Sequence, residues 1–171
     1  MKLVLIALIV TLGLAASASA DPFDDGVIAY RRADYATAAR LWRPLAMDGD
    51  AEAEYSLGVM YHAGQGVEQD FAEALSWYRK AVAQGFAAAQ YQLGNMFLAG
   101  TGVPQDYAAA MSWYRKAAKQ RAPYAQRAVG LMYENGLGVA EDYVEAMKWY
   151  RLAEDQSDTS GPGIAPSQRK R

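Results

Sequence analysis

Few side chains in this sequence could carry out catalysis. The 171 residues contain one histidine, His62, and no cysteine. A catalytic triad needs a serine and an acid placed around its imidazole, and a zinc site needs several His, Cys or carboxylate ligands. No nucleophile motif accompanies His62, and one imidazole with Glu52 or Glu54 makes a weak metal site. We therefore expect no enzymatic activity, no metal and no cofactor.

Three Gly-x-Gly pairs could suggest a nucleotide-binding loop. They begin at Gly64, Gly100 and Gly136. The dinucleotide fingerprint requires a third glycine and a preceding strand, and this sequence offers neither. The pairs also recur at a constant spacing, so we interpret them as turn glycines. Gly64 is well suited to the left-handed position that ends a helix.

Three Trp-Tyr-Arg triplets could stack on the bases of a nucleic acid. They occupy residues 77–79, 113–115 and 149–151. Their regular spacing instead favours rings packed in a core with a solvated arginine beside them. The net charge of −2 and the pI near 5.4 also argue against a broad nucleic-acid interface. We expect no nucleic-acid partner.

These motifs all belong to a repeat of 36 residues without insertions. Each unit has two amphipathic segments at helical spacing. In the first unit we expect one helix over 51–63, with a stripe formed by Ala53, Leu57, Met60 and Tyr61. We expect a second helix over 71–83 that buries Phe71, Ala74, Leu75, Trp77 and Tyr78.

The second helix of each unit has a recognisable start. Asp70 is the expected N-cap, and Glu73 three residues later completes a capping box. Asp142 and Glu145 repeat this pattern in the third unit. Ala109 occupies the glutamate position in the middle unit, so we expect no capping box there.

The first twenty residues have the pattern of a cleaved secretory signal. Lys2 precedes an apolar stretch at 3–14, and Ala18-x-Ala20 forms a cleavage site before Asp21. The stretch is shorter than a membrane-spanning helix, so we expect no stable membrane insertion after cleavage. The mature protein, Asp21–Arg171, is then expected to be periplasmic or secreted.

The remaining chain divides at the repeat boundaries into a degenerate N-terminal capping hairpin, three full units and a tail. Tyr35, Trp42 and Gly49 precede Phe71, Tyr78 and Gly85 by one period, which places the capping hairpin upstream of the first unit. The tail contains Gly and Pro and ends in basic residues, so we expect it to be flexible. The expected ranges are 21–50 for the capping hairpin, 51–86, 87–122 and 123–158 for the repeats, and 159–171 for the tail.

The repeated segments resemble Sel1-like repeats. The matching stretches include "AEYSLGVMYHAGQGVEQDFAEALSWYRKAVAQG", "AQYQLGNMFLAGTGVPQDYAAAMSWYRKAAKQ" and "AQRAVGLMYENGLGVAEDYVEAMKWYRLAEDQ". The N-terminal hairpin resembles the shorter tetratricopeptide unit. The resemblance implies an all-α fold, a right-handed α-solenoid of Sel1-like and tetratricopeptide-like hairpins whose first helices line a concave face. It also implies a non-enzymatic adaptor or scaffold, with exported members tied to envelope signalling or host contact.

Two departures from the repeat pattern affect the expected structure. Arg121 stands where Gly49 and Gly85 end their helices, so we expect a different junction between the second and third units. We expect no polar capping helix after Leu152, so that the outer face of the last hairpin would be open. Self-assembly into a homo-oligomer through that face is the alternative to the adaptor function.

A protein or peptide partner should contact the positions where the repeats differ along the concave face. The Tyr55–Tyr91–Arg127 row is the sharpest hypothesis, because Tyr and Arg are frequent interface hot spots. An equally good interpretation is that the tyrosines pack between adjacent helices, and the sequence leaves both open. The candidate binding residues are Glu52, Tyr55, Val59, His62, Tyr91, Asn95, Tyr124, Arg127 and Leu131.

Overall fold

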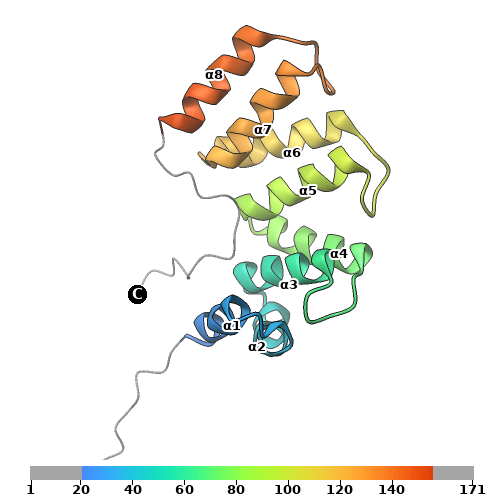
Figure 1. The fold of residues 1–171 in the computed structure, drawn as a ribbon, viewed down its shortest axis with the longest axis vertical. Coiled ribbons are helices and arrows are strands. Elements are labelled where there is room, and N and C mark those ends of the chain that lie inside the picture. Colours follow the sequence, from blue (N-terminus) through green and yellow to red (C-terminus); the bar gives the residue numbers. More distant parts are fainter. Residues whose placement is uncertain (1–20, 156–171) are drawn as a thin grey trace, which may run out of the picture.

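The computed structural model describes residues 21–155 and contains eight α-helices and no strands in that range (Figure 1). The expected signal segment, 1–20, and the expected tail, 159–171, lie outside the described residues. The predicted all-α solenoid is confirmed. The helices are α1 (Pro22–Arg31), α2 (Tyr35–Met47), α3 (Ala51–Ala63), α4 (Phe71–Ala83), α5 (Ala87–Ala99), α6 (Tyr107–Lys119), α7 (Pro123–Glu134) and α8 (Tyr143–Glu154).

Consecutive helices pair as hairpins, and the hairpins stack along the chain (Figure 1). The odd-numbered helices are the first helices and the even-numbered ones the second helices of the four hairpins. The first helices α3, α5 and α7 each pack against their own second helix and against the second helix of the preceding hairpin. No helix within residues 21–155 is both long and apolar enough to span a bilayer.

Helix boundaries in the first repeat agree with the sequence pattern. The Asp50 carboxylate accepts a hydrogen bond from the Ala53 N–H at 2.9 Å, and Asp70 caps α4 in the same way. Gly64 ends α3 with a φ of +68°, a conformation that costs a residue with a Cβ about 1–2 kcal/mol. The predicted stripe is buried at Ala53, Leu57 and Met60.

The predicted capping boxes are wrong in one respect. The Asp70 and Asp142 carboxylates accept hydrogen bonds from backbone N–H groups, as expected. Their own N–H groups, however, do not donate to the side chains of Glu73 and Glu145. The Asp70 N–H donates to the Tyr61 carbonyl at 3.0 Å, and the Asp142 N–H donates to the Tyr133 carbonyl at 2.9 Å. The loop therefore folds back on the first helix, and this contact replaces the glutamate half of the box.

Each hairpin closes around a glycine that faces an aromatic ring. A Cβ built on Gly94 would lie 2.4 Å from Cε1 of Tyr114, closer than van der Waals contact allows. The same contact pairs the first helix with the second in the other three hairpins. The four pairs are Gly26 with Trp42, Gly58 with Tyr78, Gly94 with Tyr114 and Gly130 with Tyr150.

The expectation of a different junction at Arg121 is wrong. Arg121 adopts a φ of +62°, in the same left-handed region as Gly85 at +81°. The Arg121 N–H donates to the Ala118 carbonyl and the Gly85 N–H to the Val82 carbonyl, both at 2.9 Å. Stacking of the third hairpin therefore imposes the glycine conformation on an arginine.

Core packing of the Trp-Tyr-Arg triplets holds for Tyr78 and Tyr114, whereas Tyr150 in the last triplet is half-buried. Trp77 is buried, whereas Trp113 and Trp149 are half-buried. The Lys116 ammonium sits 3.8 Å from the Trp113 ring centroid. A cation over the ring shields it in place of core atoms.

Replacing Gly94 with alanine tests the ring contact. An alanine inside an exposed helix is normally about 1 kcal/mol more stable than a glycine. Here the added Cβ must displace the Tyr114 ring, so we expect Gly94→Ala to lower the free energy of unfolding by about 1–3 kcal/mol. Urea denaturation measures the change, and a variant more stable than the original would contradict the packing.

Candidate protein-binding site

Tyr55 is unavailable to a partner. Its side chain is 2% exposed, and its ring lies 6.0 Å from Tyr78 and 5.2 Å from Phe86. Burial raises the pKa of its hydroxyl well above the ordinary value. The structure therefore places Tyr55 between adjacent helices, the second of the two interpretations of this row, because the following hairpin covers it.

Tyr91 and Tyr124 lie together on the face of the first helices α5 and α7. Their rings meet edge to face with centroids 5.0 Å apart, and Tyr91 also contacts Tyr114 at 5.5 Å. Both side chains are half-buried. These two rings therefore pack between helices and remain partly exposed to solvent.

A hydrogen-bonded network crosses this face and uses a residue that sequence reasoning missed, Gln92. Gln92 bonds to the Tyr55 side chain and accepts from Asn95 Nδ2 at 2.9 Å. The Tyr114 hydroxyl donates to Asn95 Oδ1 at 2.8 Å. Asn95 is thus partly committed to internal bonds. Gln92 could have been noticed because Ser56 and Ala128 stand at its equivalent positions, so the repeats disagree there.

His62 lies at the rim and contacts aromatic rings. Its ring centroid is 5.3 Å from that of Phe71, and Nδ1 is buried without a hydrogen-bond partner among the described residues. Burial lowers the pKa of this imidazole below its ordinary value. Within residues 21–155, no group of three or more metal-ligating side chains forms a cation site. Glu52 and Val59 are half-buried on the same face.

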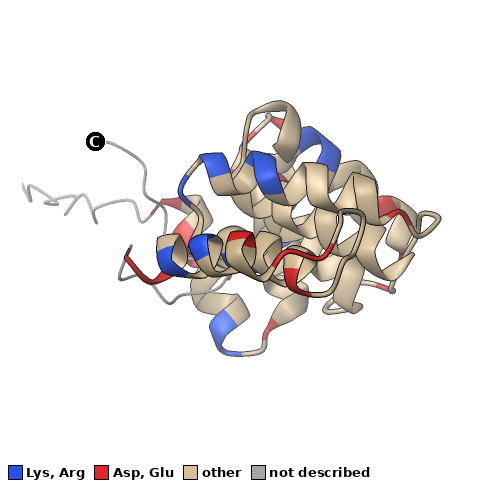
Figure 2. Cartoon of the chain, turned by 90° about the horizontal axis from the view of Figure 1, so that it is seen from above, with Lys and Arg blue, Asp and Glu red and all other residues tan. Residues whose placement is uncertain are grey.

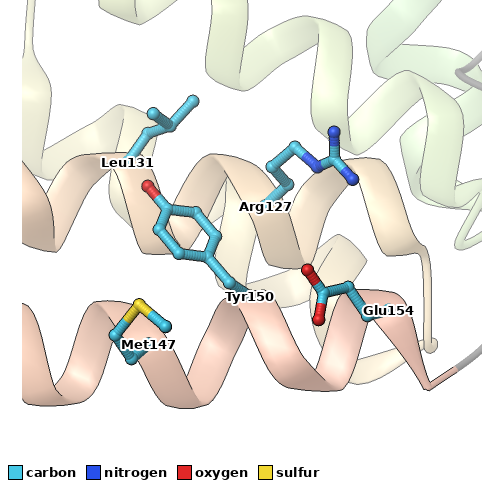
Figure 3. A pocket seen from close by; sticks show the side chains of 5 residues that line it. All are labelled: Arg127, Leu131, Met147, Tyr150 and Glu154. Atoms are coloured by element: carbon cyan, nitrogen blue, oxygen red, sulfur yellow. The ribbon is translucent and has the colours of Figure 1, made fainter.

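Arg127 and Leu131 border a cavity at the C-terminal hairpin (Figure 3). We call it the C-terminal recess; its volume is about 360 Å³. Both residues come from α7, and α8 supplies the other lining residues, which are Met147, Tyr150 and Glu154. In Figure 3 the Tyr150 and Glu154 side chains extend from α8 toward α7, and the Arg127 and Leu131 side chains lie along α7.

The chemistry of the C-terminal recess is mixed. Tyr150 donates to Glu134 Oε2 at 2.6 Å, and burial together with this bond raises its pKa to about 12. The phenol therefore stays protonated at neutral pH. Arg127 is exposed and Leu131 is 47% exposed. A cation, a carboxylate and apolar side chains in one shallow cavity suit a protein side chain better than a reaction.

Sequence reasoning did not single out Met147, Tyr150 or Glu154. Met147 is 50% exposed, whereas its equivalents Met111 and Leu75 are 2% and 9% exposed beneath the following hairpin. The available indication was the expected open face of the last hairpin. These three residues become candidates only in the structure, because it shows which side of α8 lacks a following hairpin among the described residues.

Comparison with protein-family models matches three consecutive Sel1 repeats, at residues 51–86, 87–121 and 123–158. These matches span more than half of the chain. The chain belongs to the Sel1-repeat family. A search of curated proteins gave no match.

Two solved structures share the Sel1-repeat architecture. One is a protective antigen of uropathogenic Escherichia coli described as displaying an SLR fold, with 38% identity and a TM-score of 0.73. The other is a Sel1 repeat protein from Oxalobacter formigenes, with 34% identity and a TM-score of 0.73. Each match covers 80% of this chain, which spans 30% of the first structure's chain and 56% of the second's.

Membership in the family supports protein interaction as the general role. Sel1-repeat proteins generally serve as scaffolds for protein interaction and are typically non-catalytic. The candidate positions where the repeats of this chain differ lie on the first helices, and two of them, Arg127 and Leu131, line the C-terminal recess.

The pH dependence of stability tests the environment of His62. Because the folded state disfavours the imidazolium, the unfolded chain binds more protons, and stability falls as the pH drops below the ordinary histidine pKa of about 6.5. Leucine occurs at the equivalent position of the next repeat, Leu98. We therefore expect His62→Leu to remove the decrease in the free energy of unfolding that His62 causes at low pH. Urea denaturation between about pH 8 and pH 5 measures it. Parallel stability curves for the two proteins would show that His62 is not the source.

Proposed function

We propose that this Sel1-repeat protein is a periplasmic or secreted adaptor that binds a protein or peptide partner. The binding surface runs along the first helices from Tyr91 and Tyr124 to the C-terminal recess. An exported adaptor of this kind has a place in envelope signalling or in contact with a host. The sequence pattern of the first twenty residues supports export.

One observation carries the proposed binding surface. Along the row of equivalent positions the side chains change from buried Tyr55, through half-buried Tyr91, to exposed Arg127. Exposure therefore increases toward the C-terminal recess, where Arg127 and Leu131 line a cavity. Arginine and tyrosine are among the side chains that carry most of the binding energy at interfaces, and both line the C-terminal recess.

Replacement of Arg127 with glutamate tests the adaptor function. Arg127 is exposed, so we expect Arg127→Glu to leave helicity and melting unchanged and to abolish partner capture by reversing the charge at the recess. Crosslinked affinity capture from the native envelope, read by mass spectrometry, measures the loss. A lowered melting temperature would instead show that Arg127 is structural.

A matched control for this experiment is Arg32→Glu. Arg32 is also exposed but lies at the end of α1, far along the chain from the recess. An envelope protein enriched with the unchanged protein and with Arg32→Glu, but lost with Arg127→Glu, supports the adaptor. A partner retained by Arg127→Glu contradicts the proposed surface.

Self-assembly through α8 is the second candidate function. The observation in its favour is the exposure of large apolar side chains on that helix: Tyr143 is 60%, Val144 69% and Met147 50% exposed. The equivalents of Met147 in the earlier hairpins, Ala39, Leu75 and Met111, are buried. A second copy that covered this face would bury the same type of surface that holds the hairpins together.

Light scattering coupled to size-exclusion chromatography tests self-assembly. If α8 pairs with another copy, the protein elutes as a dimer or larger species at micromolar concentration. Met147→Glu should convert it to a monomer, because a carboxylate would be buried at the contact. A monomer before any substitution counts against this function and leaves the adaptor.

A further inference from the structure

The charges of this protein are segregated between its helices. Between residues 21 and 155, nine of the 13 Lys and Arg residues lie on the second helices α2, α4, α6 and α8, which carry three Asp and Glu residues. The rest of this range holds four basic and 15 acidic residues. Figure 2 shows blue segments within helices and many of the red segments at helix starts and loops. The second helices therefore form a positively charged layer in a chain whose net charge is negative.

The basic residues share one face of the second helices. They occupy the positions equivalent to residues 76, 79, 80 and 83 of α4, a spacing of i, i+3, i+4 and i+7 that defines one side of a helix. We call it the second-helix face. One of these positions is arginine in all four hairpins, forming a ladder of Arg43, Arg79, Arg115 and Arg151.

Aromatic rings, rather than carboxylates, hold several of these cations. Arg43 donates to the Tyr61 hydroxyl of the next hairpin at 2.9 Å, and Arg115 donates to Tyr133 in the same way. Lys80 lies 3.7 Å from the Trp77 ring centroid. Among residues 21–155, no carboxylate forms an ion pair with the four arginines, whereas Lys148 pairs with Glu145.

A guanidinium has five N–H groups in a planar fork, so a bond to one tyrosine leaves several for a ligand. The ring contacts also fix the side chains in position before any ligand arrives, which reduces the entropy lost on binding. Arg43 and Arg115 of the arginine ladder are therefore positioned, and no carboxylate within residues 21–155 forms an ion pair with any of its four arginines. Its chemistry suits carboxylates, which match the guanidinium fork with two parallel hydrogen bonds.

Grooves with apolar floors run beside the ladder. One of about 410 Å³ lies between α2 and the Gly66–Val67 loop, where Ala39 and Pro44 accompany Arg40 and Arg43. A second of about 400 Å³ occurs two hairpins further on, at residues shifted by 72, and combines Met111 and Val139 with Arg115, Lys116 and Lys119. The grooves recur because the second glycine of each loop packs against the start of the preceding second helix.

We propose that the second-helix face is a separate binding surface for an acidic protein segment, whose carboxylates pair with the arginine ladder and whose apolar side chains enter the grooves. The grooves favour a peptide over an anionic bilayer. The headgroups of an anionic bilayer would bind to positive charges without any grooves. Grooves of about 400 Å³ beside the cations can instead hold individual side chains of a peptide. Its cations lie on the second helices, whereas Tyr91, Tyr124 and Arg127 of the adaptor surface lie on α5 and α7. Only α8 contributes to both surfaces, because it also lines the C-terminal recess.

Fluorescence anisotropy on the full-length protein tests the proposal. The probe is a labelled peptide of repeated Glu-Leu-Glu-Ala units, compared with the same peptide carrying Gln at each Glu position and with phosphatidylglycerol vesicles. We expect saturable binding of the acidic peptide that weakens with salt, and little binding of the Gln peptide or of the vesicles. Binding to the vesicles but not the acidic peptide would assign the face to a membrane surface and overturn the proposal. Failure to bind either would overturn it as well.

Charge reversal on the ladder locates the peptide. We expect Arg79→Glu with Arg115→Glu to weaken binding by about tenfold or more, since two attractions become repulsions. Arg79→Glu alone keeps the Arg115–Tyr133 contact and should weaken binding in the same direction without changing the melting temperature. Arg32→Glu and Arg127→Glu should leave the affinity unchanged. An equal loss with Arg32→Glu would show non-specific charge attraction and contradict a built surface.

Discussion

The contact on which the rest of this structure depends is an aromatic ring seated on a helix glycine. A ring from the second helix occupies the space where the first helix has no Cβ, as Tyr114 does over Gly94. A buried tyrosine contributes about 150–250 Å² of surface to the core, and the missing Cβ lets the two backbones approach closely enough for that burial. The same pairing occurs in all four described hairpins, so the two helices of each hairpin approach each other at an equivalent glycine.

Stacking then determines which side chains are available for binding. Each first helix covers the outer side of the preceding second helix, which is why Met111 is buried. Between residues 21 and 155 nothing covers α8, so Met147 is exposed although its sequence context is the same. The C-terminal recess is therefore a consequence of position in the stack. In a quasi-one-dimensional fold, stability and exposure both depend on nearest neighbours.

Charge is divided between the two layers of helices, whereas both layers contain aromatic rings. The first helices hold the Tyr91–Tyr124 pair and the Gln92–Asn95 network, which combine packing with a polar surface. The second helices present cations supported by rings of the same or the next hairpin. A solenoid of this size thus offers two chemically distinct faces, one suited to tyrosine- and arginine-mediated contacts and one suited to acidic segments.

The sequence by itself determined the helices, because their causes are local: Asp70 as N-cap, Gly64 at the left-handed position and the apolar stripe at helical spacing were all predictable. It also indicated Arg127 and Leu131, because the repeats differ there. Tertiary structure decided the rest. Whether Tyr55 binds or packs depends on the Phe86 that the next hairpin brings over it, and the left-handed Arg121 follows from the same stacking. The Asp70 N–H donates to the Tyr61 carbonyl of α3 and not to the Glu73 side chain. Periodic spacing specifies which face of a helix is apolar, but only the neighbouring hairpin determines how much of that face stays in water.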